Sequence, residues 1–177
     1  MPGSELHLKA IIESLIFASQ SPIKVSRIAQ VLEGIKLRAI KGALDNLIRE
    51  FQTSNRGFFL EEVADGFQFR TKPNYQKWVK KLTRTRPDRF SQASLETLAI
   101  VAYRQPVVRS DIEQIRGVDT GGVLKFLLEK HLIKILGRKA VPGRPIIYGT
   151  GGKFLEIFGL KDLKDLPSLR EIERLND

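Results

Sequence analysis

The sequence predicts a mainly helical α+β protein with small β-hairpins, built as two tandem winged-helix domains joined by a basic helical linker. Three observations support this: each half reads as three helices and a hairpin, the order occurs twice, and the segment between is rich in lysine and arginine. Of 177 residues, 42% are hydrophobic, so each half can form a small core. We expect an N-terminal domain over residues 1–72, the linker over 73–90, a C-terminal domain over 91–160 and a tail over 161–177.

The first half contains three predicted helices. The first begins at a Ser4 cap and runs to about Ser19, and the second covers residues 25–34. Alternating residues around Asp65-Gly66 then predict a β-hairpin, because this dipeptide favours a tight turn. The third helix, between these two features, carries one stripe of apolar residues at helical spacing: Ile40, Ala43, Leu44, Leu47, Ile48 and Phe51.

The second half repeats this order. Helices are predicted over residues 94–105, 110–117 and 120–131, with Ser94 as a cap and with Ser110 and Glu113 in capping-box spacing. Strands are predicted on both sides of the stretch "GRKAVPGRP". The letters repeat as well, since residues 21–31 align with 105–115 at the pairs Pro22/Pro106, Ser26/Ser110, Ile28/Ile112 and Gln30/Gln114.

Positive charge is concentrated in one segment. The net charge is +10, and residues 70–89 hold eight lysines and arginines and one acid. A helix here would carry an apolar stripe (Tyr75, Trp78, Val79 and Leu82), with Lys77, Lys80, Lys81 and Arg84 on its other faces. Two interpretations stay open: a solvated helix anchored on the nearest domain by its aromatic residues, or a salt-dependent, non-specific contact with DNA.

The sequence offers little for catalysis. There is no cysteine, the two histidines His7 and His131 have no evident third partner, and no metalloprotease, P-loop or nucleophile-elbow motif occurs. The glycine-rich residues 149–152 are interpreted as a helix lead-in or hairpin exit. We therefore expect a non-enzymatic protein without cofactor or metal. We also expect it to be cytoplasmic, since no signal peptide or membrane-spanning run is evident.

Sequence-specific DNA reading is disfavoured. The N-terminal turn of the predicted third helix in the second half offers Asp119, which repels phosphate, Thr120 and two glycines, which have no side chain to read a base. The hairpin of the first half carries Glu61, Glu62 and Asp65. A transcription regulator built on tandem winged helices is kept as the alternative function.

The first helix is apolar around much of its circumference, which suggests either a partner subunit or a central place in its own domain. For the first alternative, the candidate dimer-interface residues are Leu6, Leu8, Ile12, Leu15 and Ile16.

Several stretches resemble a known family. "LETLAIVAYRQPVVRSDIEQIRGV", "LLEKHLIKILGRKAVPGRPIIYGT" and "KFLEIFGLKDLKDLPSL" are similar to the second half of segregation and condensation protein B, and "ESLIFASQSPI" is similar to its first half. The resemblance implies a homodimer, formed through the N-terminal domains, that binds the kleisin subunit (segregation and condensation protein A) of bacterial condensin. Through the kleisin it would reach the structural-maintenance-of-chromosomes ATPase. It would support chromosome condensation and partition in cell division, close to the nucleoid and without catalysis.

The stretch "LGRKAVPGRPIIYGT" is then mainly the second wing, in which Gly143 can take a positive φ. Its residues serve as scaffold, as partner contacts or as DNA contacts. The candidate wing or partner-binding residues are Arg138, Lys139, Arg144, Tyr148, Phe154 and Phe158.

Overall fold

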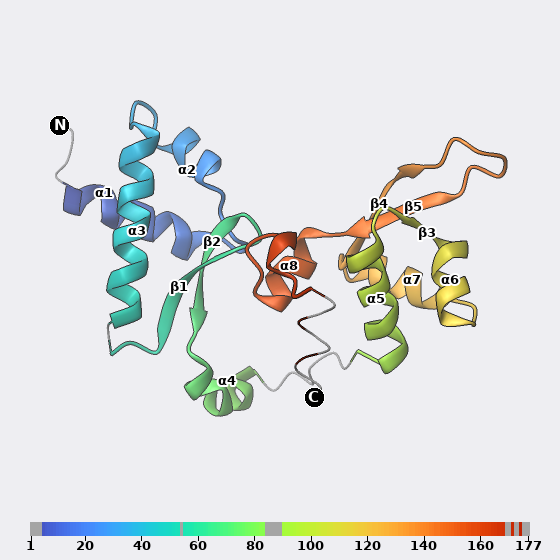
Figure 1. The fold of residues 1–177 in the computed structure, drawn as a ribbon. Helices are drawn as coiled ribbons and strands as arrows, with labels where there is room; N and C mark the ends of the chain where they lie inside the picture. Colours follow the sequence, from blue (N-terminus) through green and yellow to red (C-terminus); the bar gives the residue numbers. More distant parts are fainter. Residues whose placement is uncertain (1–4, 54, 84–89, 169–170, 172–173, 175–177) are drawn as a thin grey trace. The chain divides into compact units, whose positions relative to one another are not determined.

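The computed structural model describes residues 5–53, 55–83 and 90–168, together with Glu171 and Arg174. The chain divides into two compact units, Met1–Arg86 and Pro87–Asp177, which we describe one at a time. Helices and two small antiparallel sheets make up the fold (Figure 1), so the predicted α+β class is confirmed. No helix within the described ranges is long and apolar enough to cross a membrane.

The first unit begins with three helices, α1 (Glu5–Ala18), α2 (Val25–Val31) and α3 (Leu37–Thr53). The strands β1 (Phe58–Val63) and β2 (Gly66–Thr71) follow as a hairpin, and a 3-10 turn (Pro73–Tyr75) leads into α4 (Gln76–Thr83). Three helices and a hairpin are the order that the sequence predicts. The stripe of α3 forms the core as expected, with Ile48 half-buried and these residues buried: Ile40, Ala43, Leu44, Leu47 and Phe51.

Aromatic side chains join α3 to the hairpin. The ring of Phe51 is centred 5.4 Å from that of Phe58 on β1 and 4.9 Å from that of Phe69 on β2. The Phe58 and Phe69 rings meet edge to face at 5.5 Å. Separations of this size are favourable for aromatic pairs, so the cluster fixes the hairpin on the helix.

The turn of this hairpin differs by one residue from the prediction. Its central residues are Ala64 and Asp65, with φ of 52° and 55°, and Gly66 already pairs with Val63 in the ladder. Gly66 is needed for a different reason. A Cβ on Gly66 would stand 2.8 Å from the carbonyl carbon of Pro22, because the Pro22–Ile23 segment crosses β2 closely.

The second unit contains α5 (Gln92–Arg104), α6 (Arg109–Arg116) and α7 (Gly121–Glu129), followed by the hairpin of β4 (Ile133–Arg138) and β5 (Ile146–Thr150). A short strand, β3 (Val107–Val108), pairs with the free side of β5, so the sheet order is β3-β5-β4. Helix α8 (Gly152–Phe158) and a 3-10 turn (Leu163–Asp165) come last. The buried core includes Leu98, Val101, Ile112, Leu124, Leu127, Leu132 and Ile133.

Two predicted helix caps are wrong. Ser91, not Ser94, caps α5: its hydroxyl accepts from the backbone N–H of Ser94, which is itself buried. Helix α6 begins one residue before Ser110, and the carboxylate of Glu113 bonds to Arg109 and Thr120 instead of capping its own helix. In both cases the place of a side chain in the fold decides its role, since Ser94 is buried and Glu113 bonds to the start of α7.

The predicted lead-in at residues 149–152 is confirmed, because Thr150 ends β5 and Gly151 is the N-cap of α8. In the loop between β4 and β5, Gly143 has a positive φ of 81°, as expected, and Arg144 follows with φ of 40°. A tail segment after α8 packs on the second unit through the half-buried Leu160 and Leu166.

Candidate protein-interaction site

Helix α1 does not present the predicted interface residues in the way the sequence suggests. Ile12 and Ile16 are fully buried in the core of the first unit, so they cannot line a surface between two copies. Leu8 and Leu15 are half-buried and pack against that core. Leu6 belongs to α1, but its side chain is outside the described part of the structure.

Phe17 at the end of α1 is a large apolar residue that reaches solvent, with 80% of its surface exposed. It borders a groove of about 410 Å³ together with Ala10, Glu13, Ser14, Phe58 and Phe69. This surface could not be predicted from the sequence, because helical spacing alone does not tell which part of an apolar circumference faces the core.

Helix α4 carries the predicted apolar stripe, in which Val79 is half-buried while two large side chains face solvent. Trp78 is 63% exposed and Leu82 is 84% exposed. Lys77, Lys80 and Lys81 are exposed as well, and Arg84 lies outside the described residues. The Tyr75 and Trp78 rings lie 6.3 Å apart. Helix α4 therefore offers both apolar and cationic groups to solvent.

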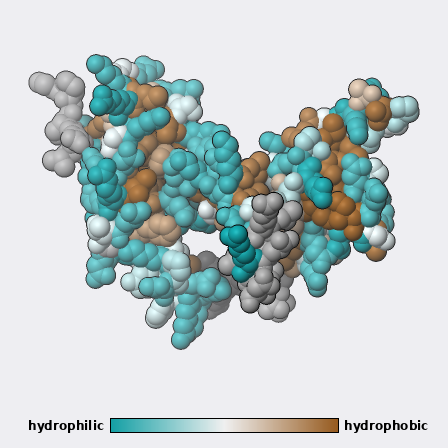
Figure 2. All heavy atoms as spheres, in the orientation of Figure 1, coloured by the Kyte–Doolittle hydropathy of each residue, from teal (hydrophilic) through white to brown (hydrophobic). Residues whose placement is uncertain are grey.

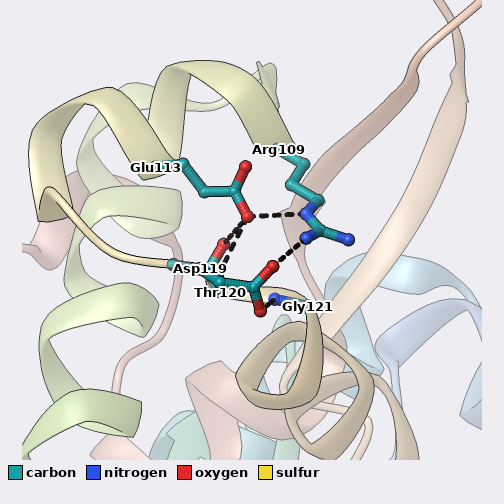
Figure 3. A network of polar contacts seen from close by, with 5 residues as sticks. All are labelled: Arg109, Glu113, Asp119, Thr120 and Gly121. Atoms are coloured by element: carbon teal, nitrogen blue, oxygen red, sulfur yellow. Dashed lines mark hydrogen bonds and ion pairs between the residues drawn. The ribbon is translucent and has the colours of Figure 1, made fainter.

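A polar network joins α6 to the start of α7 (Figure 3). The Nε of Arg109 donates to the carboxylate of Glu113 at 2.7 Å, and a terminal nitrogen of Arg109 bonds to Asp119. Glu113 also accepts from the backbone N–H of Thr120 at 3.0 Å, and Asp119 accepts from that of Gly121 at 3.1 Å. The two acids thus bond to backbone donors at the first turn of α7.

These contacts shift the ionisation of the network. The backbone hydrogen bond from Thr120, together with the bond from Arg109, lowers the pKa of Glu113. The bond to Glu113 and the charge of Asp119 raise the pKa of Arg109. The N-terminus of α7 is therefore already occupied by carboxylates, which oppose the approach of a phosphate backbone.

Two of the predicted wing residues are part of the core. Tyr148 on β5 and Phe154 on α8 are buried and pack with the second hydrophobic cluster. Arg138 donates to the carbonyl of Arg144 at 3.0 Å across the hairpin, while Lys139 is exposed. The geometry therefore supports a structural role for Arg138, Tyr148 and Phe154.

Exposed apolar residues also gather on the helices of the second unit. Phe158 on α8 is 47% exposed and its ring lies 4.9 Å from that of Phe154. Leu95 on α5 is 44% exposed, and Tyr103 is at the surface of the same helix. Apolar side chains reach the surface of both units among mainly hydrophilic ones (Figure 2).

The described residues contain no cluster of three or more side chains able to hold a metal ion. His7 and His131 belong to different units, on α1 and in the turn that follows α7. The charged groups of the network in Figure 3 bond to one another and to backbone donors at the α6–α7 turn. The exposed apolar helix faces and the exposed lysines of α4 are suited to binding.

Exposed apolar and cationic helix faces on two small helix-and-hairpin units are typical of a protein that binds other macromolecules. Residues 10–169 match the family described as segregation and condensation complex subunit ScpB. The chain belongs to this family, whose members are complex subunits.

Curated relatives and solved structures are similar to this chain to the following extent. Segregation and condensation protein B of Syntrophotalea carbinolica is 49% identical over 96% of the chain and 86% of the relative, and that of Moorella thermoacetica is 45% identical over 94% and 85%. A crystal structure of a dimer of the ScpB N-terminal domain complexed with an ScpA peptide is 32% identical over 45% of this chain and 99% of that chain, with a TM-score of 0.42.

Proposed function

We propose that this chain is a non-enzymatic accessory subunit of bacterial condensin that binds the kleisin ScpA as a homodimer. Through the kleisin it would join the ATPase of the complex and support chromosome condensation and partition in the cytoplasm, at the nucleoid. The observation that carries this proposal is the family match over residues 10–169, which includes both units. The relative bound to an ScpA peptide suggests the partner.

Binding of the kleisin is tested with the purified full-length chain. Isothermal titration with the kleisin subunit of the same organism should give saturable binding at micromolar concentration or below, and nuclease treatment should leave it unchanged. Absence of binding at these concentrations would overturn the proposal.

The homodimer is proposed to form through the first unit, at the groove beside Phe17. An exposed phenylalanine next to an apolar groove is suited to a self-complementary contact between two copies. Phe17→Glu should convert the dimer to a monomer in light scattering coupled to gel filtration. Val31→Glu, which changes an exposed apolar residue of α2 in the same unit, is the matched control. A dimer that survives Phe17→Glu places the interface elsewhere.

Non-specific contact with DNA through α4 is a second candidate. It is favoured by Lys77, Lys80 and Lys81 on an exposed helix and by the lack of any acid over residues 66–83. Binding of a duplex of arbitrary sequence should fall steeply between low and physiological salt. Lys80→Glu with Lys81→Glu should weaken it at least about tenfold. Lys125→Glu with Lys153→Glu makes the same charge change in the second unit and should have a smaller effect.

A sequence-specific transcription regulator is not favoured, because Glu113 and Asp119 occupy the start of α7. A footprint at a defined sequence that persists at physiological salt would reverse this conclusion.

A further inference from the structure

The hairpin of the second unit carries a charge opposite to that of its counterpart in the first unit. The β1–β2 hairpin, residues 58–71, contains three acids and one arginine, a net charge of −2. The β4–β5 hairpin, residues 133–150, has no acid and a net charge of +4, from Lys134, Arg138, Lys139 and Arg144. The same element therefore presents different chemistry to solvent in the two units.

The four cations of the β4–β5 hairpin are exposed and are not neutralised by the protein. No ion pair within the described ranges includes any of them. The nearest acids along the sequence, Glu129 and Glu156, pair with Lys125 and Lys153 instead. Positive charge that lacks a counter-charge on an exposed element favours an anionic partner.

Hydrogen bonds hold the exposed loop of this hairpin in one shape. The backbone N–H groups of Lys139 and Arg144 each donate to a carbonyl within the loop at 2.9 Å. A terminal nitrogen of Arg138 donates to the carbonyl of Arg144 at 3.0 Å, which uses one of the five donors of the guanidinium. Figure 1 shows the loop end of the hairpin extending away from the helices of this unit. The cations are therefore positioned before a partner arrives, which reduces the entropy lost on binding.

We propose that the β4–β5 hairpin binds the phosphates of duplex DNA, independently of α4. Duplex DNA carries one negative charge per ~1.7 Å of its length, so cations spaced along a hairpin can each meet a phosphate. A two-stranded β-ribbon also fits the major groove. The guanidinium groups of Arg138 and Arg144 match a phosphate through two parallel hydrogen bonds. The inference adds a DNA contact on the second unit to the function proposed above and does not rest on binding of the kleisin.

This contact is independent of base sequence. Glu113 and Asp119 occupy the start of α7, which opposes the entry of that helix into a groove beside the hairpin. Phosphate contacts position a protein on DNA without reading its sequence. A duplex of arbitrary sequence is therefore the appropriate probe.

The experiment measures binding of the full-length chain to a fluorescent duplex of mixed sequence by anisotropy, at several salt concentrations. Lys139→Gln with Arg144→Asn removes two cations, and asparagine accepts the positive φ of 40° at position 144. Each lost phosphate contact reduces the slope of log affinity against log salt by about 0.9. The slope should therefore fall by about 1.8, and the affinity at ~100 mM salt should fall by at least about tenfold.

The control removes the same charge from the same unit. Lys125→Gln with Lys153→Gln changes two lysines that pair with acids, and the slope should stay at the wild-type value. Lys80→Glu with Lys81→Glu, on α4, tests independence: the reduction caused by the hairpin variant should persist in this background. If only the α4 variant reduces the slope, DNA does not contact the hairpin and the inference fails.

The remaining outcomes also decide the inference. A hairpin variant that is folded by circular dichroism and keeps the wild-type slope overturns it, as does a wild-type chain that does not bind the duplex at low salt. If the double variant does not fold, Lys139→Gln alone decides, and a slope reduced by about 0.9 supports the inference. If polyglutamate displaces the duplex as well as unlabelled DNA of equal charge does, the surface binds acidic chains in general and the inference fails. None of these results depends on the kleisin titration, so the inference and the proposed function fail separately.

Discussion

The side chain of Gln105 connects the end of α5 to the end of β5. Its amide oxygen accepts from the backbone N–H of Thr150 at 2.9 Å and from the hydroxyl of the same residue at 3.1 Å, and its nitrogen donates to the carbonyl of Ala102 at 3.1 Å. Because Thr150 is buried, Gln105→Ala leaves these donors without their acceptor. We expect the free energy of unfolding in urea to fall by about 1–3 kcal/mol. Gln92→Ala, which loses an exposed bond to Glu96, should change it by less than about 0.5 kcal/mol.

Position 151 requires glycine, because the backbone of His131 approaches it closely. A Cβ at this position would stand 2.3 Å from the carbonyl oxygen of His131. We expect Gly151→Ala to lower the free energy of unfolding by at least about 2 kcal/mol, because two backbone segments must move apart. The next residue provides the control. A Cβ on Gly152, at the start of α8, would meet no other part of the described chain within 4 Å, so Gly152→Ala should be neutral or stabilising. Equal effects of the two changes in thermal unfolding would contradict this account.

Thr97 is completely buried in α5, and its hydroxyl has no hydrogen-bond partner within the part of the chain that the structure describes. Replacing it with the similarly shaped valine removes a buried hydroxyl that lacks a hydrogen bond. We expect Thr97→Val to raise the free energy of unfolding by about 1 kcal/mol. Thr120→Val should lower it, since the hydroxyl of Thr120 is also buried but lies 3.5 Å from the carboxylate of Glu113. A loss of stability in Thr97→Val would show that its hydroxyl is satisfied in solution.

Glu113 makes the stability of the second unit depend on pH in acid. The hydrogen bonds from Thr120 and Arg109 lower its pKa below the ordinary value of 4.5. Its contribution is therefore complete above pH 4.5 and is lost as the pH falls through the lowered pKa. Between neutral pH and pH 3, the wild-type chain should lose more thermal stability than Glu113→Gln, whose side chain does not titrate. Asp111→Asn, at an exposed acid of the same helix, should follow the wild-type profile. If the thermal stability of the wild type and of Glu113→Gln fell in parallel with pH, the network would not be the cause of the pH dependence.

The elements with strong periodicity could be predicted from the sequence. Helix α3 is the best case, since five of the six residues assigned to its stripe are buried. The strand β3 was missed because its two residues carry no periodic pattern, and it exists only by pairing with β5. The sequence does not distinguish Ser91 from Ser94 as the N-cap of α5, because both serines precede the same apolar stripe. The burial of Ser94 depends on tertiary packing.

The candidate surfaces were harder to predict than the fold. The apolar spacing of Ile12 and Ile16 fits a dimer interface, but the same spacing also fits a helix face that packs in the core. In this structure both residues are buried in the core. Phe17, which was not among the predicted interface residues, has 80% of its surface exposed. The lysines of α4 are exposed as the sequence indicates, whereas the exposure of Trp78 could not be foreseen because an aromatic stripe is normally buried.

The exposure of Trp78 also makes the chain a reporter of its own contacts. It is the single tryptophan of the sequence, so the emission excited at long wavelength comes from α4 alone. Because most of the indole already faces water in the folded chain, denaturation changes its surroundings little. A partner that covers α4 removes that water and moves the emission to the blue. Fluorescence of this protein therefore reports mainly on what covers one helix, whereas a buried tryptophan reports mainly on unfolding.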